Sequence, residues 1–174
     1  TTGKHFPGHG SVLEDTHYSE AVDRRRWPEL ASADLVPFQA AIEAGVDAMM
    51  MGHVTYPAID PLPAGYSEHW IRRILRDSMG FDGIVVSDDI AMAAAEGAGA
   101  VGRRVQLHLE AGCDVVLVCK PALVDEAIDA VPWDHLDNAQ ERLASLVGQG
   151  APDWATLAED PRRAEAVSAL SALA

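Results

Sequence analysis

The chain is short of basic residues, of cysteine and of long apolar runs, and each shortage argues against a class of protein. Its 13 Lys and Arg residues face 27 Asp and Glu residues, a net charge of −14 that argues against a nucleic-acid partner, because phosphate binding needs a basic surface. No segment approaches about 18 uninterrupted apolar residues, so we expect no insertion into a membrane. The two cysteines, Cys113 and Cys119, favour buried free thiols in a reducing compartment over a disulfide.

The composition is otherwise globular. Hydrophobic residues make up 48% and charged residues 23% of 174 residues, which is enough for one domain with a core. The chain begins Thr-Thr-Gly-Lys, without Met or a leader, so we expect a fragment and leave open a targeting segment upstream.

One pattern occurs three times along the chain: an amphipathic stretch, a glycine and a short apolar run. A glycine just past a helix fits a left-handed C-terminal cap, and the apolar run is typical of a strand buried on both faces. The pattern therefore predicts βα units around a parallel sheet. The predicted helices are Leu35–Ala44, Glu68–Met79 and Val101–Ala111, with cap glycines Gly45, Gly80 and Gly112.

Four strands are predicted in this way. The first ends near Phe6, and the others are Ala48–His53, Ile84–Ser87 and Val115–Cys119. Four βα units make half of a (β/α)₈ barrel, which typically needs about 250 residues, and the alternative is a complete doubly wound sheet. Reactive side chains stand at the carboxyl end of every predicted strand, which favours the half barrel because a barrel gathers its site at the carboxyl ends of its strands. These side chains are Lys4, His5, His53, Asp88, Asp89 and, less clearly, Lys120.

The C-terminal part of the chain shows no site chemistry. It is expected to be helical from Pro121 to about Val131, and again over Asp134–Val147 and Ala155–Leu173. We predict that residues 1–131 form the partial barrel and residues 132–174 a helical extension of the same domain.

The third strand leads into two adjacent aspartates, in the segment GIVVSDDIAM. Two carboxylates beyond a buried strand are costly to desolvate unless something binds them. Asp88, nearer the strand, is placed to point into a barrel mouth and act as a nucleophile. For Asp89 two roles are evenly balanced: it takes part in binding at the site, or it caps the next helix.

A second cluster lies in the segment TGKHFPGHGSVLEDTH. Asp15 can hold one imidazole nitrogen of His17 and raise the basicity of the other. The glycines and polar residues around this pair predict a mobile loop. Lys4 and His5, at the end of the first strand, can both donate hydrogen bonds to a polyol.

The same segment raises a metal site. His5 and His9 have H-x₃-H spacing, and Asp15 and His17 could serve as further ligands. The usual zinc pair of histidines lies on a helix, however, and the intervening proline and glycine exclude a regular helix here. The sequence therefore favours other roles for these histidines.

Taken in order, the motifs KHFPGHG, EDTH, MMMGHVTYPAID and FDGIVVSDDIAM resemble glycoside hydrolase family 3, specifically its bacterial β-N-acetylglucosaminidase branch. The resemblance runs over about residues 1–130 and implies the C-terminal half of a TIM barrel. It also implies a retaining mechanism, with Asp88 as the nucleophile and His17, paired with Asp15, as the general acid/base.

The resemblance further implies that Lys4 and His5 bind sugar hydroxyls and that His53 lines the same pocket. The implied substrates are terminal β-linked N-acetylglucosamine residues, notably on peptidoglycan fragments during cell-wall recycling in the cytoplasm. No metal or organic cofactor is implied. The relatives carry an upstream half barrel that this sequence lacks, so we expect the chain alone to be inactive and its missing half to come from the same or another chain.

Three alternatives stay open. The first is phosphorolysis, because a histidine acid/base lacks the negative charge that would repel phosphate. The second is a metal-dependent hydrolase. The third is a sugar-binding or inert half barrel without catalysis.

Overall fold

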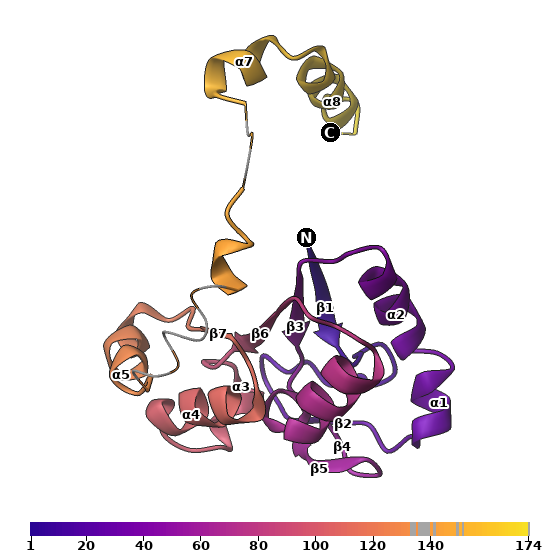
Figure 1. The fold of residues 1–174 in the computed structure, drawn as a ribbon, viewed down its shortest axis with the longest axis vertical. Helices are drawn as coiled ribbons and strands as arrows, with labels where there is room; N and C mark the ends of the chain where they lie inside the picture. The colour runs from indigo at the N-terminus through magenta and orange to yellow at the C-terminus, as the bar shows by residue number, and fades with distance from the viewer. Residues whose placement is uncertain (133–134, 136–139, 141, 149, 151, 174) are drawn as a thin grey trace.

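A four-stranded parallel sheet organises the fold, with its strands in the order in which the chain visits them, β1-β3-β6-β7 (Figure 1). The computed structural model describes residues 1–132, 135, 140, 142–148, 150 and 152–173. Sequential order in a parallel sheet is the arrangement of a barrel wall, so the predicted partial (β/α)₈ barrel is confirmed. The strands are β1 (Thr2–Phe6), β3 (Ala48–Met51), β6 (Ile84–Asp89) and β7 (Val115–Leu117).

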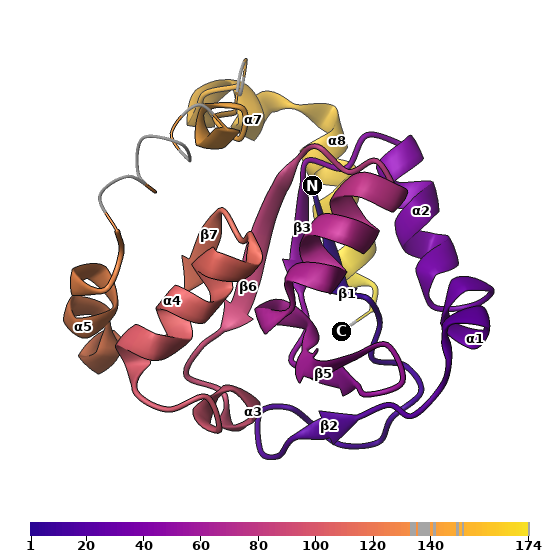
Figure 2. The same ribbon diagram turned by 60° about the horizontal axis from the view of Figure 1, so that its bottom comes forward.

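Helices connect these strands and lie along one face of the sheet (Figure 2). The three predicted helices are present within two residues of their expected ends, the middle one as a π-helix. All three cap glycines have positive φ, at +79°, +75° and +116°, as the left-handed cap requires. The helices of this layer are α2 (Leu35–Glu43), η2 (His69–Ser78) and α4 (Val101–Ala111), with the shorter α1 (Trp27–Ala31), α3 (Ala93–Glu96), η3 (Pro121–Leu123) and α5 (Val124–Asp129).

A second, three-stranded sheet was not predicted. It consists of β2 (Ala21–Val22), β4 (Val54–Tyr56) and β5 (Asp60–Pro63), followed by the short 3₁₀-helix η1 (Ala64–Tyr66). Strands of two to four residues are too short to show a period of their own. This sheet lies beyond the carboxyl end of β3 and supports the loops there.

The core lies between the sheet and its helices. Phe6 at the end of β1 is fully buried and packs edge-on against Phe38 of α2 and Trp70 of η2, with ring centroids 5.2 and 6.1 Å away. A smaller cluster joins α4 and α5 to the chain beyond β6. The aromatic cluster fixes the end of β1, where two candidate site residues stand.

Several predicted boundaries were wrong, although the elements were right. β3 ends at Met51, and after Gly52 and His53 the chain enters β4. β6 continues to Asp89, which pairs with Leu117 of β7. Since β7 stops at Leu117, Cys119 is exposed, whereas Cys113 is buried as expected; both thiols are free.

The predicted helix over Ala155–Leu173 is two helices, α7 (Trp154–Glu159) and α8 (Pro161–Ser171). Pro161 has no N–H to continue a helix, and Asp160 before it is extended and caps α8. These helices contact each other and lie apart from the sheet (Figure 1). Much of the helix expected over Asp134–Val147 lies outside the described residues, and the assignment of residues 132–174 to the barrel domain stays a prediction.

The length and hydropathy of the helices concern the prediction that the chain does not insert into a membrane. Among the described residues, no helix is both long and apolar enough to cross a membrane.

Candidate active site

Asp88 is delivered to the carboxyl edge of the sheet by β6, whose first two residues are buried. Its side chain is 16% exposed. One carboxylate oxygen, Oδ1, accepts the Asp89 N–H at 2.9 Å, and the other, Oδ2, lies 3.7 Å from Nε2 of His5. The backbone contact fixes the carboxylate and leaves Oδ2 as the oxygen that faces the histidine.

Asp89 does not cap a helix, contrary to one of the two roles considered for it. Helix α3 begins at Ala93, and the Asp89 carboxylate instead accepts the backbone N–H groups of Ala91 and Cys119, each at 3.0 Å. It therefore ties the end of β6 to the chain beyond β7. The adjacent Ser87 is fully buried and reinforces this tie, because its hydroxyl accepts the Leu117 N–H at 2.9 Å.

Lys4 and His5 both line the cavity at the sheet edge, although neighbours on a regular strand point to opposite faces. The register of β1 against β3 shifts between Gly3 and Phe6, and such an irregularity re-aims side chains. Burial lowers the pKa of His5 more than the charge of Asp88 raises it. His5 is therefore a neutral imidazole at neutral pH, able to donate and accept.

His53 follows β3 and is 2% exposed. Its Nε2 lies 3.1 Å from the carbonyl oxygen of Asp89. A carbonyl only accepts, so Nε2–H donates and the proton of the neutral ring is on Nε2. Burial lowers the pKa of His53, which keeps the ring neutral. His53 thus forms a wall of the cavity and holds the backbone next to Asp88.

Asp15 and His17 lie on the loop after β1 and form a close pair. Nδ1 of His17 is 2.7 Å from Oδ1 of Asp15, which also accepts the His17 backbone N–H at 2.9 Å. These two contacts, the backbone one first, lower the pKa of Asp15 and keep it an anion. With Nδ1–H donated to Asp15, the nitrogen that can exchange a proton is Nε2 of His17.

The base of this loop is fixed by a buried polar group. Tyr56 donates its hydroxyl hydrogen to the Gly8 carbonyl. Gly8 has φ +135°, and a Cβ there would lie 2.9 Å from an oxygen of Asp34. Arg25 joins that carboxylate to Asp23, with nitrogen–oxygen distances of 2.7 and 2.6 Å. The clamp of Arg25 and its two carboxylates therefore supports the turn from which the loop departs.

The six residues to which the family resemblance assigns a role line one cavity of about 380 Å³: Lys4, His5, Asp15, His17, His53 and Asp88. Sequence reasoning missed the lining residues at the end of β7, which are Leu117 and Cys119 rather than Lys120. The rule that sites gather at strand ends pointed to the right segment but not to these residues. Sequence reasoning also left the lining residues Met50 and Met92 unassigned, since nothing in the sequence distinguishes them from core methionines.

The metal site considered from the sequence has no matching geometry in the described part of the chain. No three His, Cys, Asp or Glu side chains among those residues converge as a group that could hold a metal ion. Nε2 of His9 lies 2.8 Å from the Glu14 carbonyl, and Nδ1 of His17 is held by Asp15.

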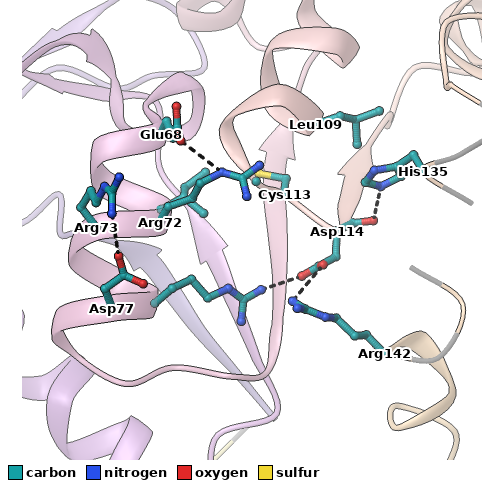
Figure 3. Close-up of a pocket in the computed structure, with 12 residues that line it drawn as sticks. Glu68, Arg72, Arg73, Asp77, Leu109, Cys113, Asp114, His135 and Arg142 are labelled. Carbon is teal, nitrogen blue, oxygen red and sulfur yellow. Dashed lines mark hydrogen bonds and ion pairs between the residues drawn. The ribbon is translucent and has the colours of Figure 1, made fainter. Parts of the chain in front are cut away.

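A larger cavity, of about 810 Å³, lies between η2 and the segment around Asp114, and none of the six residues lines it (Figure 3). Asp114 binds Arg76 and Arg142 there, at 2.9 and 3.4 Å, and accepts the Val85 N–H at 2.8 Å. Arg76 also donates to the carbonyls of Phe81 and Gly83. The ion pairs in this cavity connect η2 to the start of the strands, which is a structural role.

The fold and the site define a class: a partial (β/α)₈ barrel with two adjacent carboxylates and two histidines at the carboxyl ends of its strands, and a further Asp–His pair on the loop after β1. Residues 1–146 match the family model described as glycosyl hydrolase family 3 N terminal domain. The chain belongs to glycosyl hydrolase family 3.

Relatives agree with this assignment. A beta-hexosaminidase of Stenotrophomonas maltophilia strain K279a is 58% identical over 164 residues, which are 94% of this chain and 48% of that protein. One from Xylella fastidiosa strain 9a5c is 56% identical over 161 residues, 92% of this chain and 48% of that protein. The chain spans about half the length of these curated relatives.

Among solved structures, a family 3 β-N-acetylglucosaminidase from Paenibacillus matches with a TM-score of 0.78 and 33% identity, over 87% of this chain and 32% of that one. NagZ from Neisseria gonorrhoeae, in complex with N-trifluoroacetyl-D-glucosamine, matches with a TM-score of 0.69 and 39% identity, over 86% of this chain and 46% of that one.

Proposed function

We propose that this chain carries the nucleophile and the acid/base of a retaining exo-β-N-acetylglucosaminidase. The supporting observation is the convergence of Asp88, the Asp15–His17 pair and the polar end of β1 on one cavity. The names of the relatives and the amino sugar bound to the Neisseria structure support the substrate class.

In the proposed reaction, Oδ2 of Asp88 attacks the anomeric carbon while the bond from that carbon to the leaving oxygen breaks. His17 gives the proton on Nε2 to the leaving oxygen, and Asp15 stabilises the imidazolium before this transfer. A water molecule then attacks the anomeric carbon, His17 takes its proton and the Asp88 carboxylate leaves. The ammonium of Lys4 and the neutral ring of His5 bind sugar hydroxyls.

The finer assignments belong to the same proposal. We place the substrate among peptidoglycan fragments with a terminal β-linked N-acetylglucosamine, and the reaction in the cytoplasm, on the strength of the family resemblance. We also propose that the chain alone is inactive and that the cavity needs the half barrel that it lacks.

The test is to join the chain to the part of the Stenotrophomonas relative that it does not match, and to assay both proteins with an aryl β-N-acetylglucosaminide. We expect the joined protein to release N-acetylglucosamine and the chain alone to release none. Full activity of the chain alone would refute the need for the missing half. An inactive, folded joined protein would favour the sugar-binding or inert half barrel.

Two conditions separate the enzymatic alternatives. In phosphate buffer, a sugar 1-phosphate as the main product would show that the reaction is phosphorolysis and not hydrolysis. Activity that is lost with a chelator and restored by zinc would favour a metal-dependent hydrolase. We expect free sugar in both phosphate and non-phosphate buffers, and no effect of the chelator.

A further inference from the structure

His108 of α4 lies behind the cavity wall and has no part in the proposed reaction. Its side chain is fully buried. The ring packs against Tyr66 and His53, with centroids 4.4 and 5.8 Å away. A histidine is an expensive residue to bury merely to fill space, because its nitrogens need hydrogen-bond partners.

The hydrogen bonds of the two histidines determine where their protons are. Nδ1 of His108 lies 2.8 Å from the Gly65 carbonyl, so Nδ1–H donates. Nε2 of His53 donates to the Asp89 carbonyl. Burial lowers the pKa of His108 to about 3, so its ring is neutral. Each neutral ring therefore keeps one nitrogen without hydrogen: Nε2 of His108 and Nδ1 of His53.

These two nitrogens are both buried, and neither has a partner within the described residues. Both are acceptors, so they cannot satisfy each other. A donor with two hydrogens, such as a water molecule, can serve both, and a buried polar site with several partners is where a protein holds such a water.

Gly65 links the same two residues through the backbone. Its N–H donates to the carbonyl of Gly52, next to His53, at 3.2 Å, while its own carbonyl accepts from His108. A Cβ on Gly65 would lie 2.7 Å from Cε1 of His108, so this position admits only glycine beside the ring. The backbone of η1 therefore couples His108 to the turn that carries His53.

We propose that His108 is a positioning residue of the candidate site: it fixes the ring orientation and tautomer of His53 through Gly65 and through a water molecule that the two rings share. His53 in turn holds the Asp89 carbonyl beside Asp88. The expected effect on catalysis rests on the proposed function. The arrangement of the two histidines does not.

The arrangement is tested on the chain labelled with ¹⁵N-histidine, by long-range ¹H–¹⁵N correlation at neutral pH. We expect the proton of His53 on Nε2 and that of His108 on Nδ1. A proton on Nδ1 of His53, or on Nε2 of His108, would overturn the proposal without any variant. This spectrum does not depend on activity, so it separates failure of the inference from failure of the proposed function.

The H108F variant keeps an aromatic ring but removes both polar contacts. We expect the His53 signals to move toward an average over both tautomers, whereas H69Q, on the exposed side of η2, leaves them in place. In the joined protein we expect kcat to fall about tenfold with KM within about twofold, because His108 acts on the orientation of the nucleophile. Unchanged His53 signals in folded H108F would overturn the proposal, and so would an unchanged kcat.

Discussion

Replacing Arg25 with Met should destabilise the protein severely, because Arg25 is the cation between two poorly exposed carboxylates. The side chains of Asp23 and Asp34 are 6% and 10% exposed, and Arg25 itself is 24% exposed. Its guanidinium makes nitrogen–oxygen contacts of 2.6–3.1 Å with both. Removing one partner of a buried pair costs about 3–5 kcal/mol, since it leaves a charge without compensation.

For a chain of 174 residues, that loss corresponds to a fall in Tm of about 6–20 °C, at about 2–4 °C per kcal/mol. The assay is urea unfolding followed by circular dichroism at pH 7, with the exposed neighbour Arg24→Met as the matched control. We expect the control to change the free energy of unfolding by less than about 0.5 kcal/mol. A loss below about 1 kcal/mol in R25M would refute the reasoning, because it would equal that of a surface ion pair.

The difference in the free energy of unfolding between wild type and R25M should depend on pH in a definite direction. Burial raises the pKa of Asp23, but the hydrogen bonds from Arg25 outweigh it and the pKa is lowered. A lowered pKa in the folded state stabilises the protein above the unfolded value of about 3.9, and this contribution is lost as the pH falls through the folded value. The gap between wild type and R25M should therefore narrow below about pH 4. A gap that widens in acid would contradict the assigned charges.

Three further predictions concern the cavity. H17A in the joined protein should lose about 10²–10⁴-fold in rate on substrates with poor leaving groups and far less on activated aryl glycosides, and equal losses on both would exclude His17 as the acid. D15N should lower kcat in the joined protein, because the carboxamide no longer fixes the orientation of the His17 ring with its proton-exchanging Nε2 toward the substrate; an unchanged kcat would show that Asp15 does not position His17. Partial desolvation and the charge of Asp89 raise the pKa of the Cys119 thiol, so its alkylation by iodoacetamide should be slower than that of a free cysteine at the same pH, whereas labelling as fast as that of the free amino acid would contradict that environment.

The sequence predicted those parts of the fold that depend on local signals. Helix α4 begins and ends where its pattern predicts, and Gly112 has the positive φ of a cap, because periodicity and a missing Cβ act within a few residues. The break at Pro161 was also a local signal, but the helix-forming residues around it concealed it. The sheet of β2, β4 and β5 could not be predicted, because its strands are only two to four residues long and β2 is defined by its pairing with β4, far along the chain.

The residues of the candidate site likewise divide into those that local signals mark in the sequence and those that only the folded structure brings to the site. Residues at the carboxyl ends of strands, such as His5 and Asp88, were found because the ends of parallel strands meet at one edge. His108 could not be identified from the sequence, since its contacts with Gly65 and His53 exist only after α4 packs on η1. Supporting residues of this kind come from distant elements and leave no motif.

The identity of the nucleophile is tested most directly by trapping the intermediate. The joined protein is treated with a slow 2-fluoro glycosyl substrate, digested and mapped by peptide mass spectrometry, with D88N as the control. We predict one covalent sugar on the peptide that contains Asp88, with the modification on that residue, and no label in D88N. A label on Asp89 or on any other residue, or turnover that continues in D88N, would contradict the assignment of Asp88 as the nucleophile.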